Sequence, residues 1–421
     1  TRSRLVKAPR HNVRRQRGVA VLLLMLGVIL ATATVLLANI SRDDLRTRRL
    51  EDTRAALADA KQALIDYAVI NPDANPGQSI SLPCPDLDGG GGFIEGDAHT
   101  SNCGSTGESM LGRLPWRTLG VSVPKDAAAS CLWYVVSGSY KSAAGQTASM
   151  INADTNGQLQ LMNLDTAAVV EGLLPEDRPV AMIVAPMRAL PAQTRPAAAG
   201  TQCSPSYSPG EFLDSDVASG VSNASLAGIP DVIDVLGYYS VANDTHNDHV
   251  MTITRREIAA QLYRRPDFES GMRSLGLAVA ACFANYAATN PGGNDDKRLP
   301  WPAPVDIADY RDDTDYDDGS GGSHAGRLPD FVDDSSTTTG NAVDDVLSAC
   351  NPADVPEWSA VNLARWRHWK DHFFYAVGGA FAPGASVPTQ CGDCLTVNGA
   401  GQYAAVVIFA NARLDSLGQV R

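Results

Sequence analysis

The fold of this chain begins with an uncharged apolar run, VAVLLLMLGVILATATVLLANI, at residues 19–40. About 20 apolar residues, at a helical rise of about 1.5 Å each, cross the roughly 30 Å hydrocarbon core of a bilayer. A secretory signal peptide has a shorter apolar part that ends at a small-residue cleavage site, and no clean site of that kind follows this run. The run therefore predicts a transmembrane helix.

Positive charge is concentrated on one side of the apolar run. The segment after the run is mixed, because Arg42 is followed by Asp43 and Asp44. The leader before it contains Arg2, Arg4, Lys7, Arg10, Arg14, Arg15 and Arg17. By the positive-inside rule we expect the N-terminus in the cytoplasm and the bulk of the chain exported.

The helical pattern continues beyond the apolar run. No Gly or Pro interrupts residues 41–69. Apolar residues recur there with the period of an amphipathic helix, at Leu45, Leu50, Ala55, Ala56, Leu57, Ala60, Leu64 and Ile65. Asn71-Pro72 and Asn75-Pro76-Gly77 predict the end of the helix. We therefore expect one helix over residues 19–69, half in lipid and half amphipathic.

The basic leader ending in Gly18, the apolar helix and its amphipathic continuation resemble a type IV prepilin or a type II secretion pseudopilin. In that family a prepilin peptidase cuts after the glycine and the new N-terminal residue is methylated, which implies a cut between Gly18 and Val19. Most members carry Glu at the fifth mature position, where this chain has Leu23. A carboxylate in lipid is costly and is kept for a purpose, so its absence argues against ordinary shaft packing. Some minor pseudopilins that lack this Glu are thought to cap the tip.

The exported part extends the resemblance. The segments LPCPDLDG at 82–89, GRLPWRTLG at 112–120 and NDHVMTITRREI at 247–258 are similar to a bacterial prepilin-like group. The resemblance implies a single-pass protein of the bacterial inner membrane, with its bulk in the periplasm or on an extracellular pilus. It implies as partners the inner membrane, the prepilin peptidase and other pilins or pseudopilins. The alternative is a plain signal-anchor helix on a periplasmic binding or structural protein that never polymerises.

The chain has 421 residues and a net charge of −13. This length exceeds one typical domain core, so we expect two exported lobes. Because the leader is basic, the exported part is more acidic than the whole chain, which argues against nucleic acid as a partner. The sequence starts without Met and stops directly after Val420-Arg421, which is consistent with a fragment of a longer reading frame.

Five short blocks recur in the same order along the exported part, which predicts an internal duplication. The paired blocks are 65–72 with 284–291, 82–85 with 299–302, 112–115 with 326–329, 132–138 with 373–379, and 180–185 with 404–409. Each copy is expected to be a lobe of helix, Pro/Gly-rich loop and small antiparallel sheet, which makes the fold class α+β.

These patterns predict boundaries along the chain. The expected parts are a basic cytoplasmic leader at 1–18, a transmembrane helix at 19–40, the helix continuation and first lobe at 41–195, a linker or loop region at 196–253, and a second lobe at 254–421. Strands are expected at about 132–136, 180–184, 373–377 and 403–409, and helices at about 255–265 and 272–289. Turns are expected at Asn156-Gly157 and Asn398-Gly399.

An even number of cysteines in an exported region predicts disulfides. The cysteines are Cys84, Cys103, Cys131, Cys203, Cys282, Cys350, Cys391 and Cys394. Proximity favours pairing Cys84 with Cys103 and Cys391 with Cys394. Cys131 with Cys203 and Cys282 with Cys350 are weaker pairings, since sequence does not fix the connectivity. A zinc site or a redox motif is the alternative, but there is a single Cys-x-x-Cys and it lies among Pro, Thr and Gly.

An acidic tract suggests calcium as a cofactor. Asp313, Asp315 and Asp317 alternate in the way that places oxygen ligands around Ca²⁺. An EF-hand has Gly at position six and Glu at position twelve, whereas here Gly319 comes one residue late and His324 takes the twelfth position. The tract is therefore either a solvated acidic loop or a calcium-stabilised loop of another kind, such as the resemblance to pseudopilins implies.

Catalytic motifs are missing from the sequence. It contains no G-x-S-x-G elbow, no H-E-x-x-H and no Walker loop. His246 and His249 stand near Asp244 and Asp248. A polar loop is the simpler interpretation of this segment, and a metal site is the alternative. We therefore expect no enzymatic activity, and a membrane-anchored subunit that acts by assembly.

Overall fold

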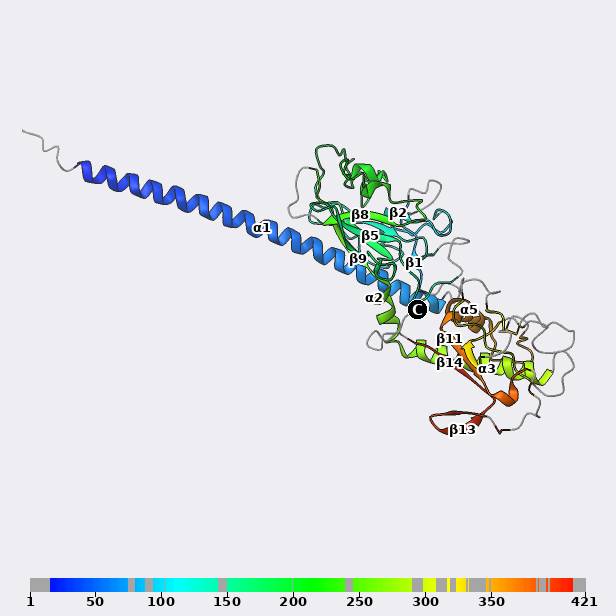
Figure 1. Cartoon of the computed structure of the whole chain (residues 1–421). Coiled ribbons are helices and arrows are strands. Elements are labelled where there is room, and N and C mark those ends of the chain that lie inside the picture. Colours follow the sequence, from blue (N-terminus) through cyan, green and yellow to red (C-terminus); the bar gives the residue numbers. More distant parts are fainter. Residues whose placement is uncertain are drawn as a thin grey trace, which may run out of the picture. The chain divides into compact units, whose positions relative to one another are not determined.

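The computed structural model describes residues 16–74, 80–87, 94–101, 103–142, 150–198, 200–238, 245–289, 298–307, 316–318, 323–330, 332, 346–347, 350–383, 385, 391–392 and 394–411. Figure 1 follows the chain from helix α1 in blue to the last strands in red. The fold is mixed α+β, with one N-terminal apolar helix and several small sheets. The chain divides into two compact units, Thr1–Ala55 and Ala56–Arg421.

Helix α1, Gln16–Ala74, contains the apolar run. Its segment Gly18–Val35 is long and apolar enough to cross a membrane, although a signal sequence near an N-terminus meets the same criterion. Farther along, Leu57 and Leu64 are at most 2% exposed and belong to the main core. One helix thus carries an exposed apolar half and a half whose apolar stripe is buried, as its period predicts.

Two helix boundaries differ from those expected. Helix α1 passes the expected stop at Asn71-Pro72 and ends two residues later, at Ala74. Helix α2, Arg255–Leu262, begins at a capping box formed by Thr254 and Glu257. Helix α3, Pro266–Thr289, begins before the expected start at about residue 272, because proline is favoured in the first helical turn.

The first lobe is built on a four-stranded antiparallel sheet in the order β2-β3-β7-β9. Its strands are β2 (Met110–Arg113), β3 (Trp133–Val136), β7 (Ala181–Ala185) and β9 (His249–Ile253). Successive side chains point to opposite faces of a strand. Accordingly, Tyr134 and Ile183 share a core with Leu57 of α1, whereas Trp133 and Met182 belong to a second core.

A second sheet in the order β6-β5-β8 encloses that second core. It consists of β5 (Leu159–Asn163), β6 (Ala168–Glu171) and β8 (Ile233–Tyr238). The sheets were expected to be antiparallel, but β5 and β8 pair in parallel, as do the short strands β1 (Leu82–Pro83) and β4 (Lys141–Ser142).

The region expected at 196–253 as a linker or loop has long loops, but it also contains two strands. Strands β8 and β9 from this region pair with β5 and β7. Phe212 and Leu226 are buried in the second core, although they stand among Ser, Gly and Pro. The region belongs to the first lobe, because its few apolar side chains are buried there. It includes two 3-10 helices, Pro209–Glu211 and Asn223–Ser225.

The second lobe has an antiparallel sheet in the order β10-β11-β14. Its strands are β10 (Ala325–Arg327), β11 (Phe373–Val377) and β14 (Ala405–Phe409), and helix α5 (Ala360–Trp369) precedes β11. Other 3-10 turns are Pro175–Asp177, Lys370–His372 and Gly379–Phe381. Side chains of α3, α5 and β11 join the same main core as those of α1. The boundary expected at residue 254 therefore does not separate two compact units.

Of the two expected turns, only one forms a hairpin. Strands β12 (Leu395–Val397) and β13 (Ala400–Tyr403) are joined at Asn398-Gly399, whose φ angles of 52° and 74° suit a primed turn. Asn156-Gly157 joins no hairpin. A Cβ at Gly157 would clash with the carbonyl oxygen of Pro179, so this glycine permits a close backbone approach instead.

Both lobes contain the same close approach between a Leu-Pro segment and a glycine on the first strand of a sheet. Gly112 pairs with Tyr134, and Gly326 pairs with Tyr375. The hydroxyl of Tyr134 donates to the carbonyl oxygen of Pro83 at 3.2 Å. The hydroxyl of Tyr375 donates to the carbonyl oxygen of Pro300 at 3.3 Å. The residue after each glycine bridges back to the same loop, in Asp86–Arg113 and Ala303–Arg327.

This geometry predicts that Gly112→Ala and Gly326→Ala are both destabilising. A Cβ at Gly112 would lie 2.7 Å from the carbonyl oxygen of Asp86, and one at Gly326 would clash with that of Ala303. Overpacking of this kind costs about 1–3 kcal/mol, measurable as a loss in the free energy of unfolding of the full chain in detergent micelles. The control is Gly276→Ala in α3, where the nearest atom lies 4.0 Å away. Equal stability of Gly326→Ala and the wild type would contradict the prediction.

Candidate functional site

The residues of the expected processing site lie on the exposed apolar part of α1. Val19 and Leu23 are each 61% exposed, and a Cβ at Gly18 would meet nothing within 4 Å. An exposed apolar surface of this extent marks contact with lipid or with other apolar surfaces. Cleavage after Gly18 remains a prediction.

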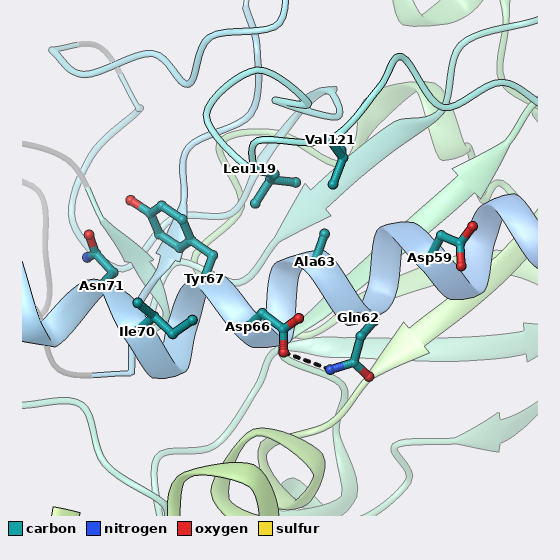
Figure 2. Close-up of a pocket in the computed structure, with 9 residues that line it drawn as sticks. All are labelled: Asp59, Gln62, Ala63, Asp66, Tyr67, Ile70, Asn71, Leu119 and Val121. Atoms are coloured by element: carbon teal, nitrogen blue, oxygen red, sulfur yellow. Dashed lines mark hydrogen bonds between the residues drawn. The ribbon is translucent and has the colours of Figure 1, made fainter. Parts of the chain in front are cut away.

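A groove of about 570 Å³ lies along the later part of α1. Figure 2 shows Leu119 and Val121 across from Ala63, with Gln62 donating to Asp66 at 2.8 Å. The other lining residues are Asp59, Tyr67, Ile70 and Asn71. Burial raises the pKa of the Tyr67 hydroxyl. An apolar wall edged by carboxylates and amides can bind a ligand or a helix, but these residues offer no nucleophile beside a base.

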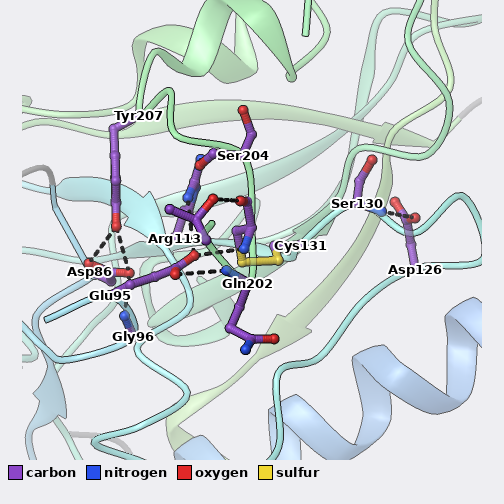
Figure 3. The surroundings of a disulfide bond; sticks show 12 residues. Asp86, Glu95, Gly96, Arg113, Asp126, Ser130, Cys131, Gln202, Ser204 and Tyr207 are labelled. Atoms are coloured by element: carbon purple, nitrogen blue, oxygen red, sulfur yellow. Dashed lines mark hydrogen bonds and ion pairs between the residues drawn. A yellow bond between two sulfur atoms is a disulfide. The ribbon is translucent and has the colours of Figure 1, made fainter. Parts of the chain in front are cut away.

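A buried arginine organises the surroundings of the Cys131–Cys203 disulfide (Figure 3). Arg113 on β2 is 3% exposed. Its guanidinium donates to the carbonyl oxygens of Ser204 and Ser206 and lies 4.2 Å from the ring centroid of Tyr207. The segment that the disulfide holds in place thus accepts both hydrogen bonds of the Arg113 Nη2 group, while Nη1 lies 3.9 Å from Oε1 of Glu95.

Asp86 lies beside this arginine. Its carboxylate accepts the N–H of Gly96 at 2.8 Å and the hydroxyl of Tyr207 at 3.3 Å. Burial raises the pKa of Asp86 to about 6, although these hydrogen bonds and the charge of Arg113 act in the opposite direction. The hydrogen bonds and the arginine–aromatic contact of this cluster hold three loops together.

In and beside the loop before β9, two buried carboxylates accept hydrogen bonds from backbone N–H groups. Asp214 accepts the N–H groups of Asn247 and Asp248 at 2.6 and 2.7 Å, and Asp248 accepts the N–H of Asp214 at 2.8 Å. Burial raises the pKa of both carboxyls. His246 lies 3.7 Å from Asp216. This geometry fits the polar loop, while Asp244 lies outside the described residues.

All eight cysteines are joined in the expected pairs, the two that proximity favoured and the two weaker ones. The disulfides are Cys84–Cys103, Cys131–Cys203, Cys282–Cys350 and Cys391–Cys394, and no cysteine is free. The expected calcium loop is described only at its end. Asp317 is included, but Asp313 and Asp315 lie outside the described residues, so calcium binding there remains a prediction.

One cluster was not anticipated from the sequence. Asp154, Asp371 and His372 bring a ring nitrogen and two carboxylate oxygens within 4.8 Å of one another. The adjacent pair Asp371-His372 was the only local signal, because Asp154 is more than two hundred residues away in the sequence. Comparisons with protein-family models, curated proteins and solved structures found no match to this chain.

The raised pKa of Asp86 predicts a pH-dependent stability. The carboxyl of Asp86 is harder to ionise in the folded state, where its pKa is about 6, than in the unfolded state, where its pKa is 3.8. Its contribution to stability is therefore fully present below pH 3.8 and is lost as the pH rises through about 6. From pH 4 to pH 7 the wild type should therefore lose up to about 3 kcal/mol relative to Asp86→Asn. Urea unfolding of both proteins across this range measures the difference.

The control for this measurement is Asp97→Asn, a change at a more exposed carboxylate whose ion-pair partner is Arg117. It should keep the pH profile of the wild type. Parallel profiles for the wild type and Asp86→Asn would show that the carboxyl of Asp86 titrates normally.

Proposed function

We propose that this chain is a prepilin-like subunit that acts by membrane anchoring and assembly. The observation that carries the proposal is helix α1, which is exposed and apolar over Gly18–Val35 and buried in a core at Leu57 and Leu64. Such a helix suits a subunit that is first held in a bilayer and then packs against the apolar helices of its neighbours. Four disulfides suit an exported bulk in an oxidising compartment.

Within a type IV pilus or a type II secretion pseudopilus, we assign the subunit to a minor or tip position. Leu23 offers no carboxylate to a neighbour's N-terminus, the contact that the resemblance implies for shaft subunits. The exported part is also large. The N-terminus is then cytoplasmic, and the prepilin peptidase and other pilins or pseudopilins are the partners.

We further propose that the exported part arose by internal duplication. The support is the equivalent register of the two antiparallel sheets, in which Tyr134 lies between Gly112 and Ile183, and Tyr375 lies between Gly326 and Val407. These are the residues that the repeated sequence blocks align. Matching side-chain hydrogen bonds to Pro83 and Pro300 add a second correspondence.

A non-polymerising, signal-anchored periplasmic binding or structural protein is the alternative. The groove along α1 favours this reading, since its volume of about 570 Å³ falls within the range of ligand sites. In that case the apolar run would stay in the membrane and no peptidase would act on it.

Processing by a prepilin peptidase distinguishes the two functions. We expect that coexpression of the full chain with the peptidase removes the mass of residues 1–18, because the family cuts after the glycine that is Gly18 here. Intact-mass spectrometry of the purified protein measures this loss. Gly18→Ala should abolish it.

The matched control is Gly27→Ala, because a Cβ at either glycine meets nothing within 4 Å. Gly27→Ala should be processed like the wild type. An uncut wild-type protein, or normal processing of Gly18→Ala, would support the alternative function.

A further inference from the structure

The ring of His372 is held in one orientation. Its Nδ1 lies 2.8 Å from the carbonyl oxygen of Ala410, and the N–H of Ala410 donates to the carbonyl oxygen of His372 at 2.8 Å. The ring centroids of Trp369 and Phe409 lie 5.0 and 5.9 Å from the centroid of the His372 ring. A carbonyl only accepts, so Nδ1 carries a proton, and a neutral ring presents the lone pair of Nε2 on its other side.

That Nε2 atom is buried and has no hydrogen-bond partner among the described residues. His372 is 6% exposed, and Nε2 faces the Oδ2 atom of Asp154 at 3.7 Å. Hydrogen bonds from nitrogen to oxygen span about 2.7–3.2 Å. The distance is therefore too long for a shared proton, and a lone pair facing a carboxylate calls for a cation between them.

Asn152 contacts both acidic residues of the cluster, the carboxylate of Asp371 and the backbone of Asp154. Asp371 is buried, and its Oδ1 accepts the side-chain amide of Asn152 at 2.7 Å. The N–H of Asp154 donates to Oδ1 of the same Asn152 at 2.9 Å. A histidine that donates its other ring N–H to a carbonyl, beside a carboxylate that is itself hydrogen-bonded, as Asp371 is, is the usual surrounding of a bound metal ion.

The hydroxyl of Tyr263 is also buried and has no hydrogen-bond partner among the described residues. Burial raises the pKa of this hydroxyl, and the charges of Asp154 and Asp371 act in the same direction. The side chain of Asp154 is 36% exposed and leaves a route to solvent.

We propose that Asp154, Asp371 and His372 bind one divalent transition-metal ion, and that Zn²⁺ fits them best. Zinc lies about 2.0–2.2 Å from nitrogen and oxygen ligands. Nε2 of His372 and Oδ2 of Asp154 are 3.7 Å apart. If each lay about 2.1 Å from an ion, the angle Nε2–ion–Oδ2 would be about 120°, near the tetrahedral value. The imidazole favours zinc over Ca²⁺ and Mg²⁺, which prefer oxygen alone.

The ion would join distant segments of the chain. Asp154 precedes β5 of the first lobe, whereas Asp371 and His372 lie in the 3-10 turn before β11 of the second. The alternative is a protonated His372 that forms an ion pair with Asp154 without a metal. The two arrangements differ in metal content, which decides between them.

The test uses the untagged full chain in detergent micelles, stripped with a chelator and dialysed against Zn²⁺. We expect one zinc per chain by elemental analysis, a higher melting temperature, and visible absorption bands when Co²⁺ replaces zinc. His372→Gln and Asp154→Asn should each weaken zinc binding by at least about 10–100-fold, the loss that mutation of a mere outer-shell partner already causes. His324→Gln is the matched control, because His324 is exposed and stands outside the cluster.

Circular dichroism of the stripped proteins shows whether each variant is folded, and Asp154→Asn is the gentler change because its side chain is partly exposed. Zinc retained by folded His372→Gln overturns the proposal. So does a wild-type chain that stays metal-free at micromolar Zn²⁺, which would leave the ion pair as the arrangement. Binding of Ca²⁺ in preference to Zn²⁺ at these residues would overturn the assignment of the metal.

Discussion

The first lobe depends on the packing of one helix face against one sheet. Leu57 and Leu64 of α1 share a core with Tyr134 and Ile183 of the central strands, and all four are nearly inaccessible to solvent. Each such side chain contributes about 1.5–3 kcal/mol when it is fully buried. The sheet therefore owes one of its two cores to the helix that begins with the apolar run. Removal of that helix from the chain would take away part of the fold as well as the apolar run.

Local patterns predicted the elements whose cause is local. The period of apolar residues predicted α1, and the run at Phe373–Val377 predicted the bounds of β11 as the structure has them. Asn398-Gly399 predicted a hairpin because both residues tolerate positive φ. Proximity predicted Cys84–Cys103 and Cys391–Cys394, whereas Cys131–Cys203 and Cys282–Cys350, the weaker pairings, depend on contacts between segments about 70 residues apart.

Features that depend on distant partners were missed. The parallel pairing of β5 with β8 and the place of β9 beside β7 follow from packing across long stretches of chain. Gly157 was expected in a turn, but a glycine is required there because the backbone of Pro179 lies too close for a Cβ atom. The carboxylates around His372 could not be assembled from spacing, because one of them comes from the other lobe.

The contacts of Arg113 make one part of the fold depend on a disulfide. Two carbonyl oxygens that satisfy its buried guanidinium belong to Ser204 and Ser206, directly after Cys203, which is linked across 72 residues to Cys131. In a reducing compartment this segment is untethered, and the loop-closure entropy of holding it over the arginine amounts to about 4 kcal/mol. Oxidation of Cys131 and Cys203 thus stabilises the segment that covers the buried guanidinium of Arg113.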